Sequence, residues 1–235
     1  MSALSLKVLA LVTMLIDHVG AVFFPQHIFL RYIGRLSFPI YAFLIAEGFV
    51  HSKNRWKYFL RLFVFGIVSE IPYDFLFYGG IFSTRSQNIM FELALGVLVL
   101  FCAEMVSQKQ KYLFVVPAAG LILLSEVLGL SYGIYGMLLI LTAYIVREKG
   151  TKIQALYSAG TTIIFNGMVD FSLPFIFGPL EILSTNSIQS MAVFAAFPIM
   201  LYNGQKGKMI LKWFFYIIYP AHLVLFILVR YIIKI

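Results

Sequence analysis

The chain is poor in charged residues and has almost no cysteine. Only 12% of its 235 residues are charged, whereas a soluble domain carries about 25%. A single cysteine, Cys102, excludes an internal disulfide and a cysteine-rich metal site. Apolar residues make up 61% of the chain, and the mean hydropathy is +0.93. Because an apolar surplus of this size has no role in water, the composition indicates an integral membrane protein with many spans.

Hydropathy predicts an all-α, polytopic membrane helix bundle with nine or ten transmembrane helices. The apolar stretch 173–183, broken by Pro174 and Pro179, is either a re-entrant segment or the tenth span. Short connections and the lack of an internal repeat predict a single membrane domain over residues 1–235. The nine predicted spans lie near residues 3–24, 30–50, 56–79, 88–106, 112–129, 132–146, 152–169, 188–203 and 209–231.

Basic residues follow every second predicted span. The basic residues that give the net charge of +8 lie at span ends. We therefore expect a lipid bilayer, and no nucleic acid, as partner. The first span has no cleavage pattern, and we expect it to be retained. Under the positive-inside rule, the N-terminus and the loops after spans two, four, six and eight lie in the cytoplasm of a cell-membrane protein. The side of the C-terminus depends on whether 173–183 crosses the membrane.

Lys7 and His18 lie inside the apolar first span. Eleven residues at about 100° each make nearly three full turns, so both side chains share one helix face about 16 Å apart. Asp17 lies on an adjoining face. Since an ionisable group at membrane depth is costly unless it faces protein or water, we expect this face to line a protein interior or a cavity.

Other charged residues also fall within predicted spans. Arg31 and Arg35 are four residues apart and share a face, as do Glu70 and Asp74. Structural ion pairing and a functional role are equally compatible with these residues. The same choice applies to a further set: Glu47, Glu92 and, nearer a span end, Glu126.

The first span suits acyl transfer from coenzyme A. The His18 imidazole titrates near neutral pH and can take a proton from a nucleophile and return one. Asp17 could orient the ring or stabilise its cation. Lys7, near the cytoplasmic end, could meet the phosphates of the donor. Snorkelling at the interface is the alternative role for Arg55, Lys57 and Arg61.

Several motifs resemble the TraX family of membrane proteins. They are L-K-x-L-A-x-x-x-M-x-I-D-H-x-G from Leu6 to Gly20, R-Y-I-G-R-L-S-F-P-I-Y-A-F-L-I-A-E-G-F from Arg31 to Phe49, S-E-I-P-Y-D from Ser69 to Asp74, Q-N-I-M-F-E-L-A-L-G from Gln87 to Gly96, and F-F-Y-I-I-Y-P-A-H-L from Phe214 to Leu223. The likeness covers nearly the whole chain and is weakest between about 107 and 200.

The resemblance implies a function and a site. TraX is associated with N-terminal acetylation of pilin, and the family is similar to acyltransferase-3 type enzymes, which carry a basic residue, ten residues and then a histidine in the first helix. Lys7 and His18 match that spacing, which implies acetyl-CoA as acyl donor and His18 as catalytic histidine. The acceptor is then a pilin-like protein, a glycan or a lipid. His222 matches a family position that implies no firm role.

These inferences give one candidate site and two alternative functions. We expect His18, Asp17, Arg31, Arg35 and Glu47 to be catalytic, with Arg31 or Arg35 stabilising the oxyanion. We expect Lys7, Arg55 and Arg61 to bind the donor's phosphates, and no metal. Buried acids and proline-broken helices also suit a proton-coupled transporter. A non-catalytic membrane assembly protein is the third possibility.

Overall fold

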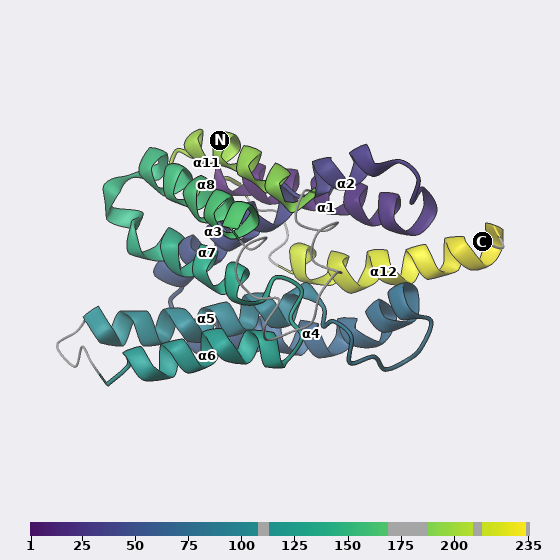
Figure 1. Cartoon of the computed structure of the whole chain (residues 1–235), viewed down its shortest axis with the longest axis horizontal. Helices are drawn as coiled ribbons and strands as arrows, with labels where there is room; N and C mark the ends of the chain where they lie inside the picture. The colour runs from purple at the N-terminus through teal and green to yellow at the C-terminus, as the bar shows by residue number, and fades with distance from the viewer. Residues whose placement is uncertain (108–112, 169–187, 209–212, 234–235) are drawn as a thin grey trace. The chain divides into compact units, whose positions relative to one another are not determined.

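The computed structural model describes residues 1–107, 113–168, 188–208 and 213–233. Their regular structure is helical, with one isolated β-bridge between Gln87 and Leu130 (Figure 1). The all-α fold is therefore confirmed. Four stretches of the described residues are long and apolar enough to cross a membrane: Ala3–Phe23, Ile28–His51, Ile89–Val106 and Phe214–Ile233.

The helices form two compact units. The first unit comprises Met1–Leu44 and Ile145–Lys208, and the second comprises Ile45–Tyr144 and Met209–Ile235. The boundary falls inside one helix and near the end of another, so the prediction of a single membrane domain stays a prediction.

The first unit is built on helix α1 (Ala3–Phe23), which packs against α2 (Ile28–Gly34). Ser2 caps α1, because its Oγ accepts a hydrogen bond from the Ser5 N–H at 3.2 Å. The other helices of this unit are the first part of α3 (Ser37–His51), η1 (Arg147–Lys149), α8 (Thr151–Met168), η3 (Ser190–Ala195) and α11 (Ala196–Met200). Its core joins α1, α3, α8 and α11 through buried side chains that include Leu6, Ala10, Phe43, Ala155 and Ile199.

The second unit contains α4 (Arg55–Tyr78), α5 (Ile89–Ser107), α6 (Val115–Val127), α7 (Gly133–Ile145, up to Tyr144) and α12 (Phe214–Ile233). Here α4 packs against α5 and α12, and α5 packs against α6 (Figure 1). The Asn54 side chain caps α4 by accepting from the Lys57 N–H at 2.8 Å, and Gly79 ends it with a φ of +74°. Every 18-residue window of α4 holds at least three charged residues, so α4 is long but unusually charged for a span.

Two predicted spans are less regular than expected. The span predicted at 30–50 is two helices, because a turn at Arg35 and Leu36 separates α2 from α3. The span predicted at 188–203 is the short η3 followed by α11. The described helices of this span, Ser190–Met200, are shorter than the stretch of about 20 residues that crosses a bilayer, and the chain before residue 188 lies outside the described ranges. The possible tenth span at 173–183 lies outside the described residues.

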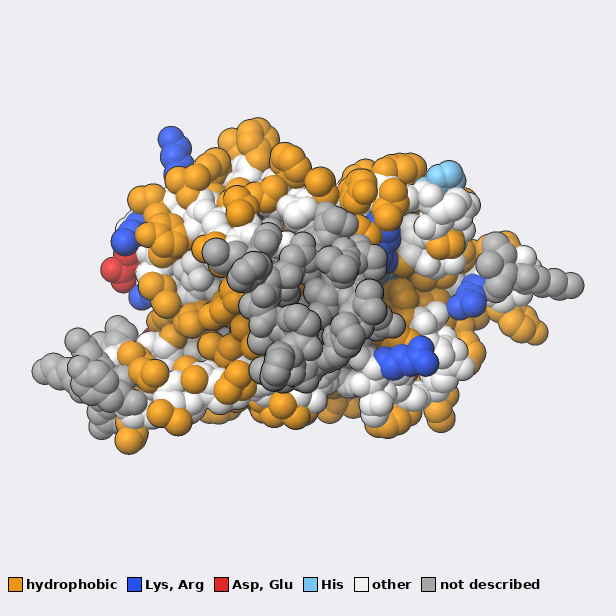
Figure 2. All heavy atoms as spheres, in the orientation of Figure 1, with side chains coloured by type: hydrophobic (Ala, Val, Ile, Leu, Met, Phe, Trp, Pro, Cys, Tyr) orange, Lys and Arg blue, Asp and Glu red, His pale blue; other side chains and the backbone are white. Residues whose placement is uncertain are grey.

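The surface is largely apolar. Hydrophobic side chains spread over the helices on the face seen in Figure 2, and charged ones are sparse there. Large apolar side chains are more than half exposed on both units, among them Phe197 at 69% and Ile71 at 61%. Such a surface fits a bilayer as solvent, and the prediction of a multi-pass membrane protein is confirmed.

Candidate functional site

Asp17 and Arg35 form an ion pair in the interior of the first unit. The Arg35 Nη2 donates to both carboxylate oxygens of Asp17 at 2.7 Å. Asp17 is only 8% exposed. The Arg31 Nη1 lies 3.4 Å from the same carboxylate. Two guanidinium groups thus converge on one carboxylate, which compensates a charge that would be costly at membrane depth.

The junction between α2 and α3 brings both arginines to Asp17. Arg35 caps α2 with helical angles, φ −60° and ψ −19°, and its N–H donates to the Arg31 carbonyl at 3.1 Å. The two side chains therefore keep the common face that their spacing predicts. The buried Gly34 permits this approach, because a β-carbon there would overlap the Asp17 side chain. Gly34 lies within the motif from Arg31 to Phe49, but residue spacing alone gave no reason to assign this glycine a role.

The charge cluster also holds a third segment of the first unit. The Arg35 Nη1 donates to the Gln189 Oε1 at 3.2 Å, just before η3. The Ser37 hydroxyl donates to the carbonyl of Ala10 in α1 at 2.9 Å. These bonds fix α1, the α2–α3 junction and the start of η3 against one another. Gln189 was missed, because a lone amide in a region of weak family likeness gives no signal.

Lys7 and His18 occupy one side of α1, as predicted, because the helix is continuous between them. Both residues are half-buried, and between them on this side Leu11 and Met14 are buried. The side that carries Lys7 and His18 is therefore packed against protein over its middle. The expected cavity between the two residues and the expected action of Asp17 on His18 stay predictions.

Three predicted site residues belong to the second unit. The Glu47 Oε2 lies 3.8 Å from the His51 Nδ1. Arg55 pairs with Glu104 at 2.5 Å and stacks on the ring of Phe49. The Arg61 guanidinium lies 5.9 and 5.8 Å from the ring centres of two tyrosines, Tyr58 and Tyr216. Glu104 would compete with a phosphate for Arg55, and the roles of Lys7, Arg55 and Arg61 as phosphate ligands stay predictions.

Four carboxylates of the second unit bind loop backbone, of which two are buried, one is half-buried and one, Glu126, is exposed. Each accepts a hydrogen bond from a main-chain N–H of the segments before α5 or at the start of α7. The donors are Asn88 to Glu70 at 3.2 Å, Ser83 to Asp74 at 2.7 Å, Tyr132 to Glu92 at 3.1 Å and Ile134 to Glu126 at 2.7 Å. This is a structural role, since such bonds satisfy N–H groups that would otherwise be orphaned.

His222 is also held by the second unit. It is 3% exposed in α12, and its Nδ1 donates to the Ile218 carbonyl at 3.0 Å. The rings of Tyr219 and Phe226 pack against it. Within the described ranges, no group of three or more His, Cys, Asp or Glu side chains is placed to hold a metal ion.

The fold and the ion-paired cluster define a polytopic, all-α membrane protein with charged groups held in its interior. The chain belongs to the TraX family: the family model described as TraX protein matches residues 2–230.

Two relatives show how far the likeness extends. A probable fimbrial assembly protein FimC, serogroup H1, of Dichelobacter nodosus is 29% identical over 242 residues, which cover 95% of this chain and 93% of the relative. Protein TraX of Escherichia coli is 29% identical over 143 residues, 59% of this chain and 54% of the relative. No solved structure matches the chain significantly.

Proposed function

We propose that the protein is an acetyl-CoA-dependent acyltransferase of the cytoplasmic membrane, with its N-terminus in the cytoplasm. Its acceptor is an amine or hydroxyl of a pilin-like protein, a glycan or a lipid. Two facts support a role in the assembly of fimbriae or pili. One is membership of the TraX family, and the other is a relative named as a fimbrial assembly protein that aligns over 95% of the chain.

The observation that carries the proposal is the ion-paired cluster directly beside His18. Asp17 is fixed by Arg35 at 2.7 Å, so the next residue on α1 is held in a defined position. Precise placement of a general base contributes strongly to catalysis. Asp17 therefore acts through the arginines, as a positioning residue for His18.

The proposed reaction proceeds in two proton transfers. His18 takes the proton from the acceptor amine or hydroxyl, which attacks the thioester carbonyl carbon and forms a tetrahedral oxyanion. Arg31 stabilises that oxyanion, since its longer 3.4 Å contact with Asp17 is more easily given up than the contact made by Arg35. The carbon–sulfur bond then breaks, and the imidazolium returns its proton to the departing thiolate of coenzyme A.

Transfer of label from radiolabelled acetyl-CoA tests this proposal. Membranes from cells expressing the protein are incubated with the donor and fractionated into protein, glycan and lipid. We expect His18→Ala to abolish the label that depends on the protein. The matched control is His51→Ala, because the His51 side chain is 52% exposed. Equal transfer by wild type and His18→Ala would remove His18 from the chemistry.

A non-catalytic assembly protein is the second candidate, favoured by the name of the relative from Dichelobacter nodosus, a probable fimbrial assembly protein. Coenzyme A separates the two functions. An enzyme that binds it gains about 2.7 kcal/mol of stability at 100 times the dissociation constant. A purely structural protein gains none, and its His18→Ala variant keeps any cellular phenotype intact.

A proton-coupled transporter has less support. Its expected relay would use the buried carboxylates of the second unit. The two that are fully buried, Asp74 and Glu92, accept hydrogen bonds from backbone N–H groups of loops. A carboxylate engaged in that way fastens a loop, and this accounts for its burial without proton transport.

A further inference from the structure

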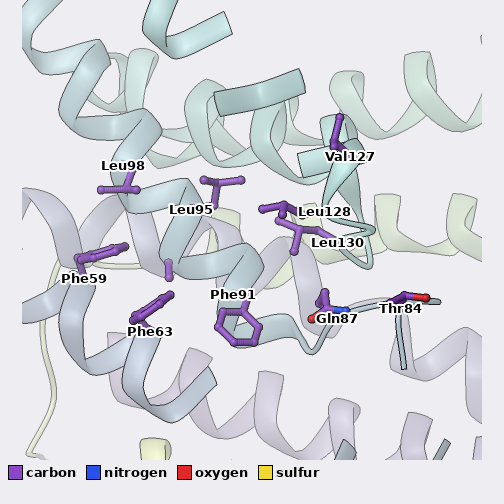
Figure 3. A pocket seen from close by; sticks show the side chains of 11 residues that line it. Phe59, Phe63, Thr84, Gln87, Phe91, Leu95, Leu98, Val127, Leu128 and Leu130 are labelled. Carbon is purple, nitrogen blue, oxygen red and sulfur yellow. The ribbon is translucent and has the colours of Figure 1, made fainter. Parts of the chain in front are cut away.

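An apolar cavity of about 490 Å³ opens on the second unit (Figure 3). Its volume lies within the range of roughly 300–1,000 Å³ that is usual for small-molecule sites. Its mouth is exposed at Val127 and Leu128, which are 82% and 47% accessible. Its walls come from α4, α5 and the α6–α7 connection, and include Phe63, Phe91, Leu95, Leu98 and Leu130.

The lining of the cavity is polar at one end only. Figure 3 places the side chains of Thr84 and Gln87 together at one end, and Phe59 and Leu98 at the other. The exposed cation Arg85 lies in the sequence between Thr84 and Gln87. A ligand that matches this lining has a long apolar body and a polar end, and Arg85, which follows Thr84 directly without lining the cavity itself, favours an anionic one.

The polar end is held open by hydrogen bonds within the unit. The Gln87 N–H donates to the Gly129 carbonyl at 3.0 Å, and the Ser131 hydroxyl donates to the Gln87 carbonyl at 2.8 Å. Gln87 also donates its side-chain amide to the Ser83 carbonyl at 3.3 Å. The rim is therefore ordered without a ligand, which lowers the entropic cost of binding one.

We propose that this cavity binds one acyl chain of a membrane phospholipid, with the lipid phosphate at Arg85. The bilayer supplies such molecules at high concentration to any groove that faces it. Charge complementarity selects a phosphate over an uncharged end group, and the apolar wall contributes affinity for each methylene buried. The site is distinct from the proposed acetyl-transfer site, because none of the residues that line it is assigned to that reaction.

Native mass spectrometry of the delipidated full-length protein in detergent tests the proposal. With added phosphatidylglycerol, we expect one saturable lipid per chain. Leu98→Trp fills the cavity and Thr84→Trp blocks its exposed rim. Each variant should bind roughly tenfold more weakly, as for the loss of about two buried methylene groups. The matched control is Leu123→Trp, at a 61% exposed position of α6 outside the cavity, which should bind like wild type.

Two further measurements test the polar end. Arg85→Ala should weaken phosphatidylglycerol binding roughly two- to fivefold, the range for an exposed ion pair. Diacylglycerol with the same chains, which has no phosphate, should bind wild type and Arg85→Ala equally.

Three results would overturn the proposal. They are the absence of a saturable lipid on wild type, Thr84→Trp binding as well as Leu123→Trp, and a protein dimer that Thr84→Trp dissociates. The last would show a second chain in the cavity instead of a lipid. Because Thr84 is exposed, we expect Thr84→Trp to fold. Its lipid binding therefore tests the proposal even if Leu98→Trp fails to fold.

Discussion

The two units hold their most buried acidic side chains against different partners. In the first unit, Asp17 meets the guanidinium groups of Arg35 and Arg31. In the second unit, Asp74 and Glu92, both 0% exposed, meet neutral backbone N–H groups. In the first unit an ion pair connects two helices, and in the second unit a carboxylate oxygen accepts a hydrogen bond from a loop.

The difference separates two uses of a buried acid. Pairing with a guanidinium requires a negative charge, since its loss strands a cation. Fastening a loop requires only an oxygen that accepts a hydrogen bond, which an amide also provides. Replacing an acid by its amide should therefore harm the first unit more than the second. The following variants test that contrast.

The largest effect is expected at Asp17. Asp17→Ala removes the partner of Arg35 and leaves a buried cation, which typically costs about 3–5 kcal/mol. Asp17→Asn should recover little of that loss, because the amide carries no charge. Unfolding of the purified protein in detergent with increasing sodium dodecyl sulfate measures the free energy. The control is Glu148→Ala, whose side chain is 82% exposed beside Arg147 and should matter by less than about 1 kcal/mol.

At Glu92, unlike at Asp17, the alanine and amide substitutions should differ in how much stability they cost. Glu92→Ala leaves the Tyr132 N–H without its acceptor at 3.1 Å, a loss of about 1–3 kcal/mol. Glu92→Gln keeps an oxygen in place and should restore most of that stability. If the amide destabilises as much as alanine, the charge of Glu92 matters and the contrast between the units fails.

Gly34 tests the close approach of α1 and α2. Gly34→Ala places a methyl group on the Asp17 side chain, and we expect a loss of about 1–3 kcal/mol from overpacking. Gly160→Ala is the matched control in the same unit, because no atom lies within 4 Å of the added β-carbon. That variant should be neutral or more stable by up to about 1 kcal/mol. Equal behaviour of the two variants would show that Asp17 can move at little cost.

Hydropathy predicted the helices well, because long apolar runs leave few alternatives. It missed the turn at Arg35 and Leu36, although Pro39 marks a break there, because proline has no N–H to donate to the Arg35 carbonyl one turn earlier and is tolerated in the first turn of α3. It also could not foresee that residues 190–200 divide into η3 and α11, since hydropathy records apolar content and not backbone regularity.

The site was predicted in part. Spacing placed Arg31 and Arg35 on one face, and the structure brings both to Asp17. Spacing along one helix cannot reveal a partner from a distant segment, so Gln189 and Glu104 were missed. It also cannot tell whether a buried acid meets an arginine or a loop N–H.

The smallest effect is expected at His51, because its pair with Glu47 is exposed whereas the Asp17 cluster is buried. Its Nδ1 lies 3.8 Å from the Glu47 carboxylate, one turn away on α3, and its side chain is 52% exposed. Such a pair contributes about 0.3–0.5 kcal/mol on a helix surface. His51→Ala should therefore unfold almost like wild type. A loss comparable to that of Asp17→Ala would mean that an exposed pair stabilises the protein as much as the buried cluster. Burial would then not explain the importance of Asp17, and His51→Ala could not serve as the control for His18→Ala.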